Sequence, residues 1–245
     1  MVWGSFGTIH ILSLLLGAGM IVGLYFLLRG CCAKVQTIIL GILSFSGIAA
    51  IIFNLVTWGS PYEYLPLHLC SLTAMVLPVA VFTRSKVLSN LMLLWSLGAV
   101  MALVVNTAQA DFSLCSATFF FYFFPHLLEF GIPILLFRLG LVKKDVKCMA
   151  STLLITLCVY TLIHWANVSL NSYFIAKQIT NPTGAVVQVN YMYSLRPENP
   201  VLALFWNWIP HPYFYMLPVV LIVLIYLAAV YLKQIIAFFQ KKAAV

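Results

Sequence analysis

Charged residues are scarce in this 245-residue chain. They make up 7% of it, and only five of them are acidic. A soluble domain carries about 25% charged residues. The chain is 64% hydrophobic, so these few charges cannot cover a water-exposed surface. A soluble globular protein is therefore excluded. Long continuous apolar runs, in place of short alternating segments, also argue against a β-barrel.

Paired metal-ligand spacings and a dense disulfide framework are absent as well. The six cysteines are scattered along the chain: Cys31, Cys32, Cys70, Cys115, Cys148 and Cys158. No cleavable signal peptide is evident, because the first apolar run is too long and its charge, Arg29, comes after it. We expect no metal and no cofactor. The net charge of +8 lies in the links between apolar runs, so it does not indicate nucleic-acid binding.

Seven apolar runs predict an all-α polytopic membrane protein with seven transmembrane helices in a single domain, residues 1–245. The predicted spans are 6–28, 35–57, 66–82, 87–105, 115–137, 148–167 and 213–231. The third span opens with Pro66, a residue favoured in the first turn of a helix. We find no internal repeat, which weakens an inverted-repeat transporter interpretation.

The basic residues indicate how the helices are oriented. Eleven of the thirteen Lys and Arg residues fall in links 1–2, 3–4 and 5–6 and in the C-terminal tail. The opposite side holds Lys177 and Arg196, together with the acidic residues Glu63, Asp111 and Glu198. Basic residues mark the cytoplasmic side of a membrane protein. The sequence therefore predicts an external N-terminus, a cytoplasmic C-terminus and a multi-pass location in the cell membrane.

One external link is unusually long, from about residue 168 to residue 212. It contains Asn181-Pro-Thr-Gly184 and four further prolines, which break regular structure. Residues 201–208 between them are apolar and Trp-containing, and they predict a short interfacial or re-entrant helix. Loops of this length usually act as lids or are disordered. The aromatic content favours a lid.

Ionisable residues within the predicted spans are the first candidates for function. At ~1.5 Å rise per residue from the cytoplasmic anchors, Cys70 lies roughly 21 Å and His126 roughly 18 Å into the membrane. Glu129 shares a helix face with His126, three residues earlier. A lone carboxylate at this depth costs ~2.5–3.5 kcal/mol, so Glu129 is expected to be protonated or paired with His126 or His68. Interhelical hydrogen bonding alone is the alternative role for these residues.

These residue types permit acyl transfer. A thiol at this depth is a weak nucleophile and needs a base beside it. His126 is the candidate base for Cys70, and Glu129 would orient His126. His68 cannot share a helix face with Cys70, but it would reach the site if Pro66 opens the helix irregularly. Lid donors such as Asn190 or Tyr191 would stabilise an oxyanion, and His164 and Asn167 would line the substrate cavity.

Several segments resemble the bacterial YwaF-type family of integral membrane proteins. They are Leu65-Pro-Leu-His-Leu-Cys70, Phe123-Phe-Pro-His126, Asn190-Tyr-Met-Tyr193 and Trp208-Ile-Pro-His-Pro-Tyr213. The first of these is the most specific, and the match runs in order over most of the chain. Where the family often has Gly before the His, this chain has Pro125. A bacterial cytoplasmic membrane is the location that this resemblance implies.

The YwaF-type proteins are in turn similar to a eukaryotic seven-helix group implicated in acyl transfer to ether phospholipids through a Cys and a His. That resemblance implies that Cys70 accepts the acyl chain, that His126 is its partner, and that membrane phospholipids are the substrates.

Two other classes of function stay open on the sequence alone. A small-solute or proton-coupled transporter would use the His and Glu residues as a binding site, but it needs a polar path to both faces. The inner halves of the helices are poor in polar residues. A metal-binding membrane protein would use His68, Cys70, His126 and Glu129, which are zinc-type ligands. No His-Glu-x-x-His motif supports it.

Overall fold

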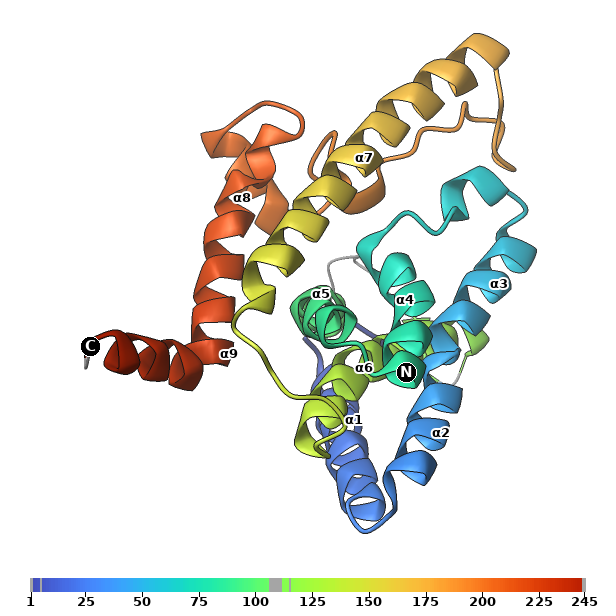
Figure 1. The fold of residues 1–245 in the computed structure, drawn as a ribbon. Helices are drawn as coiled ribbons and strands as arrows, with labels where there is room; N and C mark the ends of the chain where they lie inside the picture. The colour runs from blue at the N-terminus through green and yellow to red at the C-terminus, as the bar shows by residue number, and fades with distance from the viewer. Residues whose placement is uncertain (1, 5, 106–111, 115, 244–245) are drawn as a thin grey trace.

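The computed structural model describes residues 2–4, 6–105, 112–114 and 116–243, and Figure 1 shows their arrangement. The elements follow in chain order: β1 (Val2–Trp3), α1 (Thr8–Leu28), α2 (Ala33–Ser44), α3 (Ser46–Trp58), η1 (Pro61–Tyr64), α4 (Leu69–Thr83), α5 (Lys86–Val104), β2 (Phe112–Ser113), α6 (Ala117–Arg138), α7 (Cys148–Lys177), η2 (Tyr191–Tyr193), α8 (Pro200–Trp208), η3 (Phe214–Met216) and α9 (Leu217–Ala243).

The protein is all-helical, as the sequence predicts, apart from a short ribbon in which β1 pairs antiparallel with β2. Six helical segments are long and apolar enough to cross a membrane. These are Thr8–Leu28, Ala33–Trp58, Lys86–Val104, Ala117–Arg138, Cys148–Lys177 and Phe214–Ala237. The protein is therefore a multi-pass membrane protein. Cys115 and Asp111, which the sequence analysis uses, lie outside the described residues.

The predicted third span differs most from the structure. Helix α4 begins at Leu69 and is 15 residues long, shorter than the ~20 residues that cross a bilayer upright. Pro66 is not in its first turn, because His68 is the N-cap and has extended backbone angles. The prediction for Pro66 is therefore wrong, since residues 65–68 form a turn that precedes the helix.

The predicted second span is interrupted at Phe45. The Phe45 N–H donates to the carbonyls of Ile42 and Leu43, and the Ser44 hydroxyl donates to Gly41 O at 2.6 Å. These short-range bonds replace the regular helical pattern and separate α2 from α3. Gly41 lies against the ring of Phe82, where a larger residue would clash, so the break occurs where α2 meets α4.

The long link that the sequence predicts to be external begins later than predicted. Helix α7 continues to Lys177, so residues 168–177 are helical and not loop. We call residues 178–199 the outer loop. The predicted short helix is present as α8, with Asn199 accepting the Leu202 N–H as its N-cap and Pro200 in its first turn.

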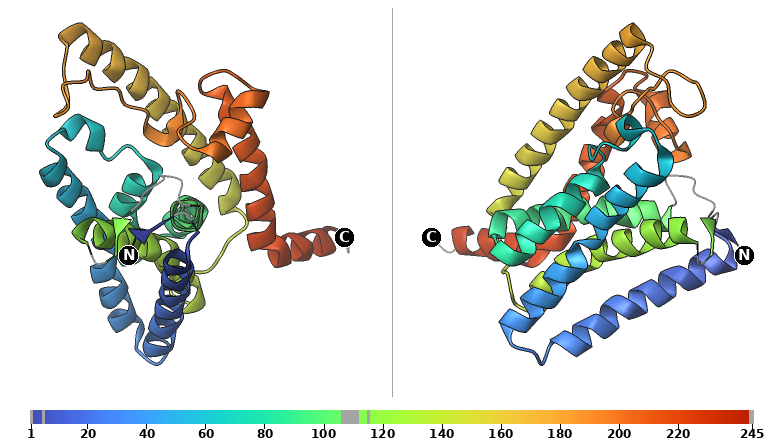
Figure 2. Two further views of the ribbon diagram at one scale, coloured as in Figure 1. Left: turned by 180° about the vertical axis from the view of Figure 1, so that it is seen from behind. Right: turned by 90° about the vertical axis from the view of Figure 1, so that its right-hand side faces the viewer.

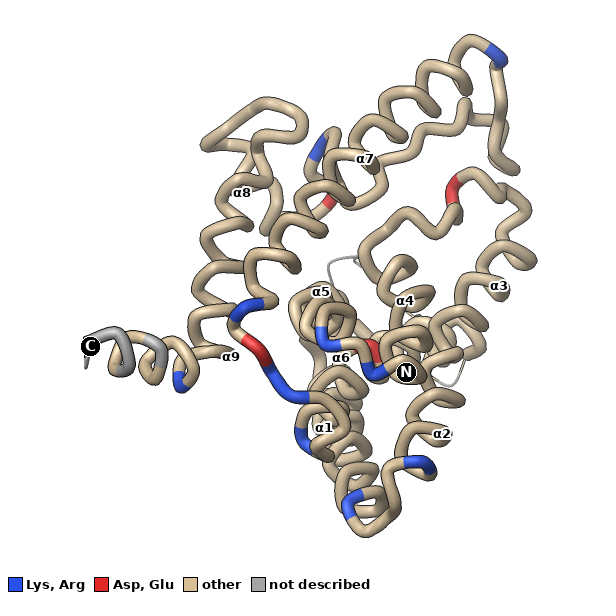
Figure 3. The backbone as a smooth tube through the Cα atoms, viewed as in Figure 1, with Lys and Arg blue, Asp and Glu red and all other residues tan. Residues whose placement is uncertain are grey.

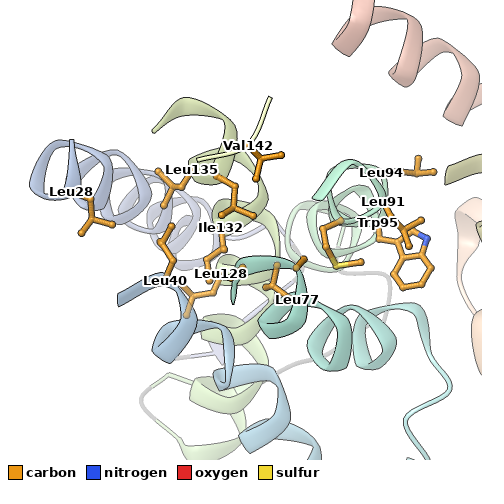
Figure 4. Close-up of a cluster of buried hydrophobic side chains, with 14 of the residues drawn as sticks. Leu28, Leu40, Leu77, Leu91, Leu94, Trp95, Leu128, Ile132, Leu135 and Val142 are labelled. Carbon is orange, nitrogen blue, oxygen red and sulfur yellow. The ribbon is translucent and has the colours of Figure 1, made fainter. Parts of the chain in front are cut away.

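An apolar core lies where α1, α2, α4, α5 and α6 meet. Figure 4 shows buried side chains from these helices packed together, with Ile132 and Leu135 of α6 near the middle. The halves of α4 and α6 that lead toward Arg84 and Arg138 contribute seven of its sixteen buried residues, and α5 contributes four. That end of the bundle is therefore filled by apolar side chains.

Basic residues gather at one end of the chain's helices. Figure 3 shows Lys and Arg in the links between α1 and α2 and between α6 and α7. Arg84, in the link after α4, donates hydrogen bonds to Ala33 O and to the Thr37 hydroxyl, and so ties this link to the start of α2. In the right-hand view of Figure 2, the start of α1 and the end of α9 lie on opposite sides of the molecule.

Candidate functional site

The turn before α4 and the first residues of that helix place His68 and Cys70 near the outer loop. Cys70 is the second residue of α4, its thiol is free, and its side chain is half-buried. His68 precedes the helix, so the two side chains need not follow helical spacing. Nδ1 of His68 accepts the Met192 backbone N–H at 3.4 Å. The irregular start that the sequence analysis required for His68 is therefore present.

His126 lies on α6, and within the described part of the chain only one of its ring nitrogens makes a hydrogen bond. Its Nδ1 lies 2.6 Å from the carbonyl oxygen of Tyr122. A carbonyl only accepts hydrogen bonds, so Nδ1 carries the proton and Nε2 of the neutral ring keeps its lone pair. The Tyr122 ring packs on the imidazole at 4.7 Å between centroids. This environment leaves Nε2 as the nitrogen that can accept a proton.

Glu129 is buried where three helices meet. Its side chain is 4% exposed. A Cβ added to Gly47 of α3 would lie 3.0 Å from Oε1 of Glu129 and 2.5 Å from Cβ of Ala74 on α4. Among the described residues, Oε2 of Glu129 has no hydrogen-bond partner. Both His126 and Cys70 interact electrostatically with its carboxyl group, so the carboxyl lies within electrostatic range of these two candidates.

Two tyrosines that were not predicted as site residues lie within electrostatic range of Cys70. Tyr122 and Tyr193 each interact electrostatically with Cys70, and with one another. Tyr122 comes from α6, one turn before His126, whereas Tyr193 comes from η2 in the outer loop. The Tyr122 hydroxyl donates to Ala102 O at 3.1 Å. Spacing from His126 would have pointed to Tyr122, but no local pattern places Tyr193 near Cys70.

The two predicted lid donors are engaged in the outer loop. The Asn190 amide donates to Arg196 O at 2.8 Å and to Oε1 of Glu198 at 2.9 Å. The Tyr191 hydroxyl donates to Tyr62 O. Burial raises the pKa of Tyr191 to about 12, so this hydroxyl stays protonated and the bond is kept at neutral pH. Both side chains hold the loop in place over His68.

Asn167 and His164 support the loop from α7. Asn167 is fully buried, and its amide donates to Tyr191 O at 2.8 Å and to the Ser194 hydroxyl at 2.9 Å. Its Oδ1 accepts the Tyr191 N–H at 2.9 Å. Nδ1 of His164 lies 3.2 Å from the same Ser194 hydroxyl. These contacts fix η2 against α7.

A cavity of about 320 Å³ opens on the other side of His68, between α3, η1 and α4. Its polar lining is Asn54, Glu63, His68 and Ser71, and its aromatic lining is Trp58 and Tyr64. Burial acts to raise the pKa of Glu63, but hydrogen bonds from Trp58, Asn181 and Ser60 outweigh it and leave this pKa below the ordinary value. Glu63 is therefore ionised at neutral pH.

A metal site is not formed by the candidates. Within residues 2–4, 6–105, 112–114 and 116–243, no group of three His, Cys, Asp or Glu side chains is placed to hold a metal ion. His68, Cys70, His126 and Glu129 thus do not converge as the metal-binding hypothesis requires.

Comparison with known proteins gives one match. No curated protein and no solved structure matches the chain. The model of the TMEM164 family matches residues 5–231, a range that includes every helix from α1 to α8 and most of α9. The chain therefore belongs to the TMEM164 family of membrane proteins.

Proposed function

We propose that the protein is an integral membrane acyltransferase or transacylase that moves an acyl chain between phospholipids through a thioester on Cys70. His126 is the base in this proposal. The observation that carries the proposal is its Nε2, which makes no hydrogen bond with the described residues, on a ring whose Nδ1–H donates to Tyr122 O. That orienting bond goes to Tyr122 O and not, as predicted, to Glu129, whose buried carboxyl interacts electrostatically with both His126 and Cys70. A nucleophile and an oriented base are the parts that such a reaction needs.

In the first step, the Cys70 sulfur forms a bond to the ester carbonyl carbon of a donor phospholipid. The thiol proton passes to Nε2 of His126. The carbonyl electrons move to oxygen and then return as the ester C–O bond breaks. The leaving lysophospholipid oxygen takes the proton back from His126, which leaves an acyl thioester on Cys70.

In the second step, the hydroxyl oxygen of an acceptor lipid attacks the thioester carbonyl carbon. His126 accepts the hydroxyl proton, the C–S bond breaks, and the Cys70 sulfur recovers that proton. The products are an acylated acceptor and the original enzyme. The two steps use the same base in the same place, so no other group has to enter.

The placement of the site supports access from the outer side. His68 and Cys70 face the outer loop, while the other halves of α4 and α6 are packed with Leu77, Ile132, Leu135 and Leu136, all buried. A transporter needs a polar path past these side chains. The packing therefore favours a reaction at one face.

We also propose seven crossings in the cell membrane, with α4 as a short third crossing and the N-terminus outside. Six helices have spanning length, and the start of α1 and the end of α9 lie on opposite sides of the molecule (Figure 2). Opposite termini require an odd number of crossings. The apolar helix α4 supplies the seventh, and the basic links face the cytoplasm.

The test is an intact-mass measurement on purified protein incubated with a defined diacyl phospholipid. Wild-type protein should gain one acyl mass that hydroxylamine removes, and Cys70→Ala should gain none. Transfer to an added lysophospholipid should fall more than about 10³-fold in Cys70→Ala and in His126→Ala. Cys158→Ala, which changes an exposed cysteine of α7, is the matched control and should behave as wild type. Equal transfer by folded Cys70→Ala would overturn the proposal.

A further inference from the structure

Acyl transfer through Cys70 creates a negative charge on the carbonyl oxygen, and that charge needs a donor. Donors placed where the charge develops are usually the largest single contribution to such reactions. The Asn190 amide is bonded to Arg196 O and Glu198, and the Tyr191 hydroxyl is bonded to Tyr62 O. The donor must therefore come from another group beside Cys70.

Two phenols interact with Cys70, and only one has a hydroxyl that is free among the described residues. The Tyr122 hydroxyl donates to Ala102 O. The Tyr193 hydroxyl makes no hydrogen bond with the described part of the chain, although its ring lies 5.7 Å from the His68 ring. Of the two, Tyr193 is the one able to donate to a substrate.

The backbone of η2 is strained to hold Tyr193 in this place. Met192 and Tyr193 are consecutive residues with φ of 52° and 55°. The left-handed region is unfavourable for residues with a side chain, and such strain persists where the surroundings impose it. Here the surroundings are specific: the Met192 N–H donates to His68, the Tyr193 N–H donates to Asn190 O at 3.0 Å, and the Tyr193 carbonyl accepts the Tyr215 hydroxyl.

The phenol is also in the right protonation state. Burial, and then the neighbouring Cys70 and Glu198, raise the pKa of Tyr193 to about 12. The group is therefore a hydrogen-bond donor throughout the neutral range and does not compete with His126 as a base.

We propose that the Tyr193 hydroxyl donates a hydrogen bond to the oxyanion that forms on the substrate carbonyl when the Cys70 sulfur attacks it. This inference rests on the proposed acyl transfer, because it assigns a catalytic residue to that reaction. The strain of η2 then has a function, since it holds the hydroxyl at the site before substrate enters.

The first test is Tyr193→Phe, which keeps the ring against His68 and removes only the hydroxyl. Loss of one oxyanion donor lowers kcat about 10²–10³-fold. We expect a fall of that size, with KM for the donor phospholipid within about twofold. Tyr173→Phe, which changes an exposed tyrosine of α7, should have wild-type kcat. A wild-type kcat for Tyr193→Phe, with Cys70→Ala inactive, would overturn this inference and leave the proposed function standing.

The second test does not depend on turnover. A long-chain saturated aldehyde adds reversibly to a thiol, with a new S–C bond and with the thiol proton on the former carbonyl oxygen. This adduct places an oxygen where the oxyanion forms. The aldehyde should protect Cys70 from maleimide in wild-type protein, and Tyr193→Phe should need at least about tenfold more aldehyde for the same protection.

The rate of maleimide labelling without aldehyde is the control for structure. It should be equal in wild type and Tyr193→Phe, because the outer loop stays in place. Equal protection of the two proteins by aldehyde would overturn the inference. Full transfer activity in Cys70→Ala would instead overturn the proposed function, and this inference with it.

Discussion

The helices around Glu129 approach one another closely because small residues stand at their contacts. Gly47 is such a residue, because α3 meets both Ala74 and the Glu129 carboxyl at its Cα. Glycine inside a helix is otherwise unfavourable. Its presence in α3 is explained by the space that Glu129 and α4 occupy, so the position of the candidate acid depends on Gly47.

Replacement of Gly47 by Ala should therefore destabilise the protein. The new Cβ would lie 2.5 Å from Ala74 Cβ, and relief of such overpacking costs about 1–3 kcal/mol. Unfolding in detergent, followed by circular dichroism, measures the effect. Gly19→Ala is the matched control, because nothing lies within 4 Å of its added Cβ, and better helix propensity should leave it as stable as wild type or slightly more so. An equally stable Gly47→Ala would contradict the packing described here.

Asn167 is a second residue whose replacement should have a measurable effect, here on the outer loop. It satisfies both the N–H and the C=O of Tyr191 from a fully buried position. Asn167→Ala leaves the Tyr191 N–H unpaired, at about 1–3 kcal/mol for a buried group, and leaves the Tyr191 carbonyl only the 3.4 Å bond from the Ser194 N–H. We expect hydrogen exchange in residues 189–194 to accelerate at least about tenfold, measured by mass spectrometry. Ser172→Ala, on the exposed side of α7, is the control, and protection as in wild type for Asn167→Ala would show that the loop is held by other contacts.

At the scale of elements, η1 and the outer loop form one layer over the start of α4. Glu63 of η1 accepts Trp58 Nε1–H at 2.6 Å and the Asn181 amide at 3.2 Å. Tyr191 reaches across to Tyr62 O. These contacts join residues about 120 positions apart in the sequence, and they hold the outer loop against η1. The layer therefore depends on the charge of one carboxylate.

Acid should loosen this layer. Because the pKa of Glu63 is below its ordinary value of 4.5, the stabilising contacts are complete at neutral pH and are lost as pH falls through that lowered value. Hydrogen exchange of residues 178–187, compared at pH 7 and at about pH 2 with correction for the intrinsic rate, should show the loss. In Glu63→Gln the same segment should be loosened already at pH 7 and change little with pH. A segment equally protected at both pH values in wild type would refute this prediction.

At the scale of the whole molecule, six spanning helices and the short α4 surround an apolar core, with the candidate residues at its outer end. α4 is short because the turn at residues 65–68 takes the place of its first helical turns. That turn lets His68 and Cys70 approach the outer loop at a depth where a full-length helix would hide them among its neighbours. The turn at residues 65–68 therefore accounts both for the short length of α4 and for the position of the candidate site.

The proposed orientation can be tested with an impermeant maleimide on intact cells. Cys32 is exposed in the α1–α2 link, so a variant with Cys32 as its sole cysteine should label only after the membrane is opened. A cysteine-free variant carrying Thr183→Cys, at an exposed position of the outer loop, should label in intact cells. The reverse pattern would place the N-terminus in the cytoplasm and the site at the inner leaflet.

The sequence by itself determined that this is an all-helical multi-pass membrane protein, because low charge and apolar length are local properties that any fold must satisfy. It also located four of the six long helices to within two residues at each end, the starts of the other two, and the short helix α8. It did not reveal the break at Phe45 or the late start of α4, since both arise where α2, α4 and the outer loop contact one another. The roles of Asn167 and Asn190 in holding the loop, and the position of Tyr193 against the His68 ring, were decided by the tertiary structure alone. These contacts join segments up to about 120 residues apart, and no periodicity within one helix encodes them.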